Sequence, residues 1–146
     1  MKLFARTILL LSLFLLAACS SGTTYTNLQP EGALVKLVTA DLKPMQAAFY
    51  QVELDGKQIR FFAVKGNDGQ IRTALDACDV CFREKKGYEQ KGDVMLCRNC
   101  NLTFPIDRIG PSSVGGCNPH FLPSRLEGDR LVIAVDELRK GARFFP

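Results

Sequence analysis

The sequence predicts a single α+β domain that is mainly β: a small antiparallel β meander, then a cysteine-rich segment, then a short C-terminal helix. Three observations predict it. Apolar and polar residues alternate on both sides of a tight turn at Asp55-Gly56. Two Cys-x-x-Cys pairs follow in a stretch that is rich in turn-forming residues. An apolar run then precedes a short helical segment at the end of the chain. Alternation with a period of two is the pattern of a strand with one buried face.

The first half of the domain is expected to consist of strands. Residues 33–39 are apolar and include β-branched side chains. Residues 50–54 and 59–63 alternate around the Asp-Gly turn, which is among the strongest local signals for a hairpin. A second turn leads into a third strand at residues 70–75, and this strand brings the chain directly to the first cysteine pair.

The end of the chain is expected to be regular as well. Residues 131–133 predict a strand, and a short helix follows with Asp136 as its N-cap and Gly141 after its last residue. The tail at residues 144–146 either packs back on the sheet or frays. Between the two regular parts, residues 78–117 contain few apolar side chains. Burial of apolar surface would therefore not order this segment by itself, and we expect a cross-link of some kind to hold it.

The N-terminus predicts export and lipid attachment. A basic start is followed by an apolar run at residues 8–18, which is too short to span a membrane and is typical of a secretory signal. The run ends Leu16-Ala17-Ala18-Cys19, which resembles the lipobox of bacterial lipoproteins. We therefore predict a signal peptide over residues 1–18 and a lipid on Cys19, which anchors the chain stably. The alternative is a plain signal peptide with a chance cysteine.

The rest of the chain divides into a lipidated flexible tether at 19–32 and a single metal-binding domain at 33–146. Loss of Lys2 and Arg6 with the signal lowers the net charge from +4 to about +2, and no basic run interleaves with aromatics, so nucleic acid is not expected as a partner. The predicted location is extracytoplasmic, in the periplasm of a cell that has one. Ser20 after the lipid cysteine favours the outer membrane over the inner one.

The cysteines indicate the chemistry. Two Cys-x-x-Cys pairs, separated by fifteen residues, match the four-thiolate pattern of rubredoxin-like and zinc-ribbon-like sites, so the predicted metal ligands are Cys78, Cys81, Cys97 and Cys100. Thiolates bind zinc, iron, copper(I) and iron–sulfur clusters, so the metal stays open. The alternatives are two disulfides that staple a structural subunit of an envelope complex, or a thiol–disulfide oxidoreductase that uses one pair.

A fifth cysteine follows in a glycine-rich loop. Cys117 stands after two glycines and before Asn-Pro, which is the layout of a loop that wraps a site. It is a candidate further ligand, a replacement ligand during metal transfer, or a buried thiol. His120, the single histidine, lies three residues further on and is a candidate ligand beside it; a solvated histidine is the simpler alternative.

The combined pattern resembles a known family. Asp76-Ala77-Cys78-Asp79-Val80-Cys81, the second cysteine pair, Phe104-Pro105-Ile106 and Gly115-Gly116-Cys117-Asn118-Pro119 are similar to the FtrD-like family of bacterial membrane-associated iron–sulfur proteins. The resemblance covers about residues 56–145. It implies a cysteine-bound metal in a setting of iron transport or electron transfer. Family members often carry several transmembrane helices ahead of this domain, whereas this chain has a predicted lipid anchor.

The export signal bears on the cofactor. Arg6 is followed by Thr7, so there is no twin arginine and the chain is expected to cross the membrane unfolded. A cluster would then be assembled outside, where a single Fe, Zn or Cu ion is easier to load. We therefore expect a lipid-anchored metal-binding accessory, not an enzyme, which passes electrons or metal to a membrane transport or electron-transfer protein and holds either an iron–sulfur cluster or a single ion.

Overall fold

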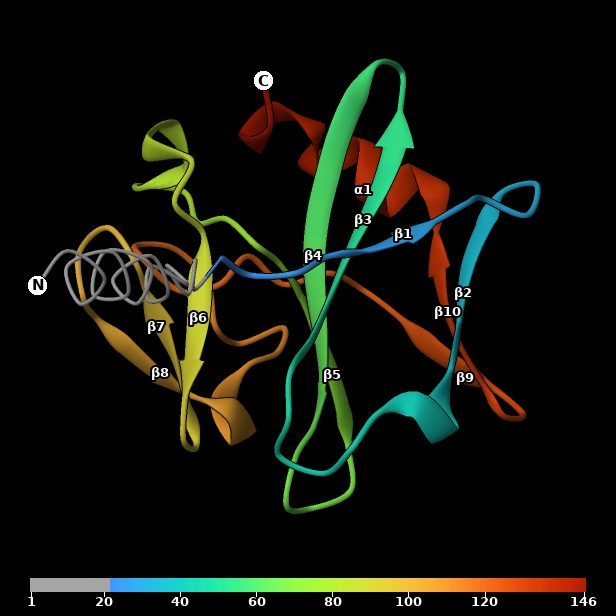
Figure 1. Cartoon of the computed structure of the whole chain (residues 1–146), viewed down its shortest axis with the longest axis horizontal. Helices are drawn as coiled ribbons and strands as arrows, with labels where there is room; N and C mark the ends of the chain where they lie inside the picture. Colours follow the sequence, from blue (N-terminus) through green and yellow to red (C-terminus); the bar gives the residue numbers. More distant parts are fainter. Residues whose placement is uncertain (1–21) are drawn as a thin grey trace, which may run out of the picture.

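The computed structural model describes residues 22–146; the predicted signal peptide and Cys19 lie outside the described residues. The described chain forms three small sheets (Figure 1). The largest has the order β1 (Thr26–Leu28), β3 (Ala48–Leu54), β4 (Lys57–Lys65), β5 (Ile71–Leu75). The second has the order β2 (Leu34–Val38), β10 (Arg130–Ala134), β9 (Arg125–Glu127), and the third β6 (Tyr88–Lys91), β7 (Val94–Cys97), β8 (Thr103–Pro105). The helices are α1 (Val135–Gly141) and the 3-10 turns η1 (Thr39–Asp41), η2 (Phe82–Glu84), η3 (Ile106–Arg108) and η4 (Ala142–Phe144).

The predicted mainly β fold and its meander are confirmed. β3 pairs antiparallel with β4, and β4 pairs antiparallel with β5. The β3–β4 turn has Asp55 at φ 53° and Gly56 at φ 75°. Positive φ at both central residues is what a two-residue hairpin needs to match the twist of its strands, and Asp-Gly reaches it at little cost.

The predicted tether is wrong in part. Residues 26–28, inside the expected tether of 19–32, form β1 and pair in parallel with β3, from Thr26 opposite Tyr50 to Leu28 opposite Val52. The ordered domain therefore begins before residue 33. A three-residue strand is too short for its alternation to be recognised, and a parallel partner that follows a long connection leaves no local turn signal.

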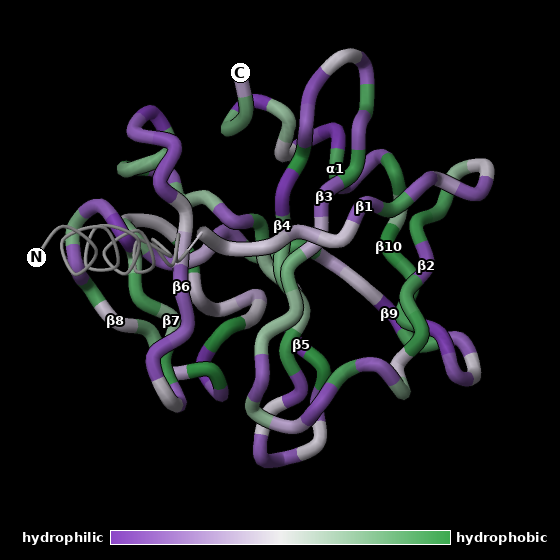
Figure 2. Tube along the Cα trace, viewed as in Figure 1, coloured by the Kyte–Doolittle hydropathy of each residue, from purple (hydrophilic) through white to green (hydrophobic). Residues whose placement is uncertain are grey.

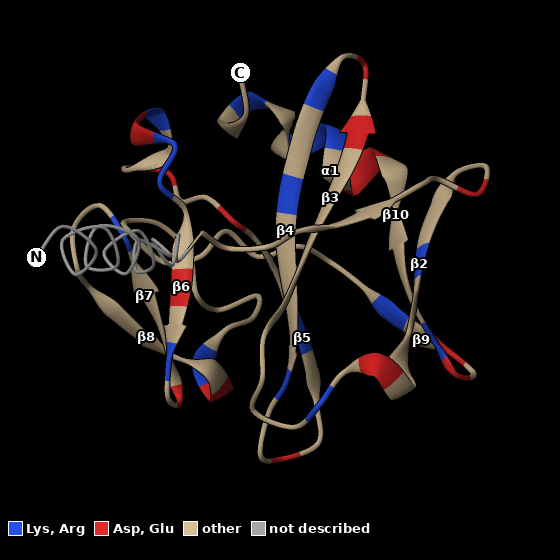
Figure 3. Cartoon of the chain, in the orientation of Figure 1, with Lys and Arg blue, Asp and Glu red and all other residues tan. Residues whose placement is uncertain are grey.

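The central sheet is buried on both faces. Phe61 and Ala63 of β4 belong to a cluster with residues of β2, β10 and α1. Phe62 and Val64, on the opposite face, belong to a second cluster that contains Cys78, Cys81 and Cys97. Figure 2 shows hydrophobic residues along β10 and the middle of the central sheet, whereas Figure 3 shows charged residues mostly at turns and strand ends. The cysteine segment therefore packs against one face of the meander, and the terminal elements pack against the other.

The C-terminal helix is confirmed, with different ends. Its N-cap is Ala134, and Asp136 lies in the first turn without a capping hydrogen bond. Gly141 is the last helical residue rather than the residue after it, and a Cβ at this position would overlap the buried side chain of Leu75. The tail is packed: Phe144 and Phe145 are buried in the first cluster.

Candidate metal centre

The first cysteine pair lies directly after β5. The chain turns at residues 78–81, where the backbone N–H of Cys81 donates to Cys78 Sγ at 3.1 Å. The N–H of Glu84 donates to the carbonyl of Cys81 and opens η2, which ends after one turn because Lys85 has φ 56°. An amide aimed at a sulfur stabilises its thiolate form. A thiol–disulfide oxidoreductase of the thioredoxin type has a long helix after such a pair, whereas this chain has a single 3-10 turn there.

The second pair closes the β7–β8 connection. Cys97 is the last residue of β7, and its N–H donates to the carbonyl of Leu102 at 2.9 Å. The N–H of Asn101 donates back to the Cys97 carbonyl at 2.9 Å, with Asn101 at φ 60°. This tight hairpin aims Cys97 and Cys100 toward the first pair. The three-stranded sheet around it was not predicted, since its strands have only three or four residues.

Cys117 reaches the centre because the chain after it is attached to β5. The N–H of Leu75 donates to the carbonyl of His120 at 2.8 Å, and the N–H of His120 donates to the carbonyl of Ala77 at 3.0 Å. The hydroxyl of Tyr88 donates to the carbonyl of Cys117 at 2.6 Å. These bonds hold the glycine-rich loop over the first cysteine pair.

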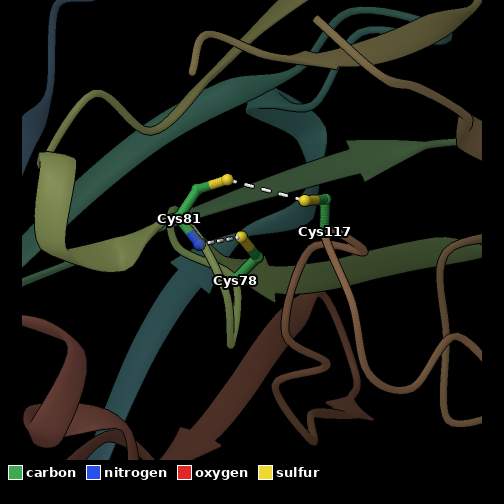
Figure 4. Close-up of side chains that lie close together, drawn as sticks. All are labelled: Cys78, Cys81 and Cys117. Carbon is green, nitrogen blue, oxygen red and sulfur yellow. Dashed lines mark hydrogen bonds between the residues drawn. The ribbon is translucent and has the colours of Figure 1, made fainter. Parts of the chain in front are cut away.

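The five described cysteines converge. Two groups of three thiols share Cys81: Cys78, Cys81 and Cys117 form one, and Cys81, Cys97 and Cys100 form the other. Within each group the sulfurs lie within 4.8 Å of one another, and Cys81 Sγ lies 3.5 Å from Cys117 Sγ (Figure 4). A tetrahedral site with metal–sulfur bonds of about 2.3 Å separates its sulfurs by roughly 3.8 Å. All five thiols are free, so the donor set has the spacing and the chemistry to bind a metal.

His120 is not brought to the sulfurs. Its Nδ1 lies 3.6 Å from Asp79 Oδ2, and its ring packs 4.8 Å from the ring of Phe144. Neither thiol group in the described chain includes it. That His120 is a ligand stays a prediction. In this geometry its backbone supports the site, because its hydrogen bonds to β5 and Ala77 hold the loop that carries Cys117.

The environment of the sulfurs is graded from buried to half-exposed. Cys78, Cys81 and Cys97 are buried, whereas Cys100 and Cys117 are partly exposed. Burial raises the pKa of Cys97 to about 11. Burial also acts to raise the pKa of Cys100, but hydrogen bonds from the Leu102 amide and the neighbouring thiols outweigh it and lower that pKa to about 7. The bond to Cys100, followed by burial, raises the pKa of Cys117. Metal binding to this set therefore releases protons.

A buried carboxyl that the sequence analysis did not single out supports the first pair. Asp76 is 2% exposed and accepts hydrogen bonds from the Tyr25 hydroxyl at 2.5 Å and from the Tyr88 N–H at 2.7 Å. Burial raises its pKa to about 6. Asp76 lies just after β5, and its two hydrogen bonds connect this point to the N-terminal segment and to β6, beside the cysteines.

The fold and the site define a class: a small, mainly β domain whose irregular half is organised around a cluster of free thiols that can bind a metal. A family model described as "Membrane iron-sulfur containing protein FtrD-like" matches residues 42–145. The chain belongs to this FtrD-like family. A comparison with curated proteins gives no match, and a comparison with solved structures gives none either. No helix in the described range is both long enough and apolar enough to span a bilayer.

Proposed function

We propose that this protein is a lipid-anchored, extracytoplasmic metal-binding accessory that exchanges electrons or metal with a membrane protein of iron transport or electron transfer. The observation that carries the proposal is the convergence of five free thiols on Cys81, in a chain that belongs to a membrane iron–sulfur family. We propose a carrier and not an enzyme.

The residues present fit a thiolate-bound metal. Cys78, Cys81, Cys97 and Cys100 would hold it, with Cys117 beside them as a fifth sulfur. A bound iron centre would supply one-electron redox chemistry. The chain's own contribution is to fix the sulfurs by two tight turns, to donate an amide hydrogen bond to Cys78 Sγ, and to cover the centre with Tyr88, Met95 and Ile106. Hydrogen bonding and burial of this kind are the means by which a protein sets the potential of such a centre.

The sulfur spacing supports a compact site. Cys81 Sγ lies 3.5 Å from Cys117 Sγ, and within each of the two three-thiol groups the sulfurs lie within 4.8 Å of one another, a spacing that is compatible with thiolates bound to one metal ion. The family description names iron–sulfur. We therefore keep both a cluster and a single Fe, Zn or Cu ion within the proposal, and the visible spectrum separates them.

Exposed apolar side chains that are close in sequence to the cysteines support a role in transfer. Four large apolar side chains are exposed in the described chain, and three are close in sequence to the cysteines: Val80, Leu102 and Val114. Val80 precedes Cys81, Leu102 is two residues after Cys100, and Val114 is three residues before Cys117. An exposed apolar group beside a half-exposed centre is what a docking partner would cover. We propose a membrane-bound redox or transport protein as this partner.

The test is to purify the exported, mature protein without chelator or reductant and to measure metal per chain together with the visible absorption. About one metal per chain, or an iron-linked visible band, is expected. Cys97→Ser should lower the metal content, and Ser112→Ala, in an exposed loop, should not. Unchanged metal in Cys97→Ser would contradict the ligand assignment.

Mass spectrometry of the N-terminal peptide tests the lipid on Cys19, and separation of inner and outer membranes tests the location.

A second candidate, a thiol–disulfide oxidoreductase, is favoured by one observation. Cys81 Sγ and Cys117 Sγ are in contact at 3.5 Å, and the neighbouring Cys100 thiol has a pKa lowered to about 7, so an accessible thiolate stands beside a potential disulfide partner. This candidate predicts metal-free protein with a reversible dithiol transition at a potential above that of structural disulfides. A metal-loaded protein without such a transition rules it out. A metal-free protein whose pairs are oxidised but not redox-active would instead indicate a disulfide-stapled structural subunit.

A further inference from the structure

A basic pocket lies beside the cysteine centre. It is a hollow of about 600 Å³ whose charged lining is entirely cationic: Arg60, Lys85, Lys86 and Arg98. Arg60 comes from β4, the lysines from the loop after η2, and Arg98 from within the second cysteine pair. None of these four side chains forms an ion pair with another described residue. Figure 3 shows basic residues on β4 and in the loop ahead of β6.

Four cations gathered without a partner attract an anion. The charges of Arg60 and Arg98 act on the carboxyl of Asp76, but Asp76 is buried and its oxygens already accept two hydrogen bonds. Arg60 and Lys85 also line the recess around the first cysteine pair, so the pocket and the cysteine centre are adjacent. The charge is therefore directed outward, toward a ligand from solution or from a surface.

Arg60 is the organised member of the pocket. It is half-buried, and its guanidinium carbon lies 5.5 Å from the ring centroid of Tyr25 and 5.8 Å from that of Phe145. Two aromatic rings hold the planar group by cation–π contact. None of the guanidinium N–H groups of Arg60 donates a hydrogen bond to an acceptor in the described chain. A fixed guanidinium with free donors is suited to bind the oxygens of a phosphate in a bidentate manner, and the lysines add charge to it.

The position of the pocket in the chain indicates the source of the phosphate. Gly22 and Thr23 line it, and Gly22 is three residues after Cys19. Three residues span at most about 11 Å. If Cys19 carries the lipid, as proposed above, the pocket lies within reach of the bilayer surface, where basic residues are attracted to anionic headgroups.

We infer that this pocket binds the phosphate of an anionic phospholipid headgroup. The binding chemistry rests on the pocket alone; the assignment to a lipid, rather than to free phosphate, also rests on the proposed anchor. Such a contact would set the orientation of the domain, with Arg98 and the second cysteine pair turned toward the membrane and the opposite end of the molecule turned away.

The test uses the mature full-length protein and one readout, the melting temperature. In detergent, inorganic phosphate and glycerol 1-phosphate are each compared with sodium chloride at the same ionic strength. In nanodiscs, phosphatidylcholine alone is compared with phosphatidylcholine containing 30% phosphatidylglycerol. A ligand that binds only the folded state raises the melting temperature, and at 100-fold excess over its Kd a rise of about 5 °C or more is expected for a domain of this size.

The variant Arg60→Gln/Lys86→Gln/Arg98→Gln should lose these rises. The matched control Lys43→Gln/Arg83→Gln/Arg108→Gln removes the same charge from exposed residues outside the pocket and should keep them. Melting in chloride shows whether each variant is folded, and an unfolded triple variant is replaced by Lys86→Gln/Arg98→Gln, which leaves the packed Arg60 intact.

Each outcome decides one part of the inference. A rise in phosphate, in glycerol phosphate and in phosphatidylglycerol nanodiscs, lost only in the pocket variant, supports it. A rise with the soluble anions but none with phosphatidylglycerol overturns the lipid as the source and leaves a free-phosphate site. No rise at all, or equal loss in pocket variant and control, overturns the pocket. Lipid analysis of Cys19 and metal content on the same samples show separately whether the proposed function fails.

Discussion

The hydrogen bond between Tyr25 and Asp76 gives a sharp test of where the folded domain begins. Tyr25 lies in a stretch that the sequence predicts to be a free tether, yet its hydroxyl donates to the buried Oδ2 of Asp76 at 2.5 Å. We predict that Tyr25→Phe destabilises the protein, because it removes the donor while the carboxylate stays buried. Phenylalanine keeps the ring, so the edge contact with Phe49 and the cation–π contact with Arg60 remain.

The expected magnitude follows from the partner. A hydrogen bond to a charged group contributes about 1.5–3 kcal/mol, and a buried acceptor that loses its donor costs a similar amount. Asp76 keeps its bond from the Tyr88 N–H and is near Arg60 and Arg98, so the carboxylate is not left wholly unpaired. We therefore expect a loss of about 2 kcal/mol in the free energy of unfolding.

The assay is urea unfolding followed by far-ultraviolet circular dichroism, at equal metal content in all samples, since bound metal adds its own stabilisation. Tyr50→Phe is the matched control. Tyr50 is on the neighbouring β3 and stacks on Phe61, and its hydroxyl has no hydrogen bond in the described chain. It should change stability by less than about 0.5 kcal/mol. Equal effects of the two substitutions would refute the reasoning, and residue 25 would then belong to the tether.

Three further predictions concern the centre and its support. Gly141→Ala should lower the free energy of unfolding by about 1–3 kcal/mol, because the new methyl overlaps buried Leu75; a gain, as helix propensity alone predicts, would contradict the packing. Tyr88→Phe removes the bond to the Cys117 carbonyl, so Cys117 should react faster with a maleimide while Cys100 keeps its rate, as peptide mapping of the adducts would show. Cys81→Ser should reduce bound metal more than Cys117→Ser does, because Cys81 belongs to both thiol groups, and elemental analysis showing the reverse order would place the metal elsewhere.

The regular part of the fold could be predicted because its signals are local. The Asp55-Gly56 turn and the alternation around it define β3 and β4 without reference to the rest of the chain. β1 could not be predicted, since its partner β3 is reached only after β2 and a long connection. The prediction placed the N-cap of the helix at Asp136 because aspartate is a favoured N-cap residue. In the structure β10 continues directly into the helix, so the N-cap is Ala134.

The candidate site could be predicted in part. Spacing alone predicted that the two cysteine pairs would share one site, since each pair needs only a tight turn, and in the structure the second pair lies next to Cys81 of the first. That Cys117 reaches Cys81 depends on the pairing of residues 120–122 with β5, a contact between distant segments. The packing of His120 against Phe144, and its approach to Asp79, also depend on elements far apart in the sequence. The bonds of Asp76 depend on Tyr25, just before β1, and on Tyr88 of β6, which no local pattern indicates.

The early start of the ordered domain has a kinetic consequence. Only five residues lie between Cys19 and Tyr25, so the two are at most about 22 Å apart when the chain is fully extended. If Cys19 carries the lipid proposed above, this short connection confines the domain to the surface of one bilayer, where it would meet partners in the same membrane by lateral diffusion. A partner in the opposite membrane would need a soluble carrier between them.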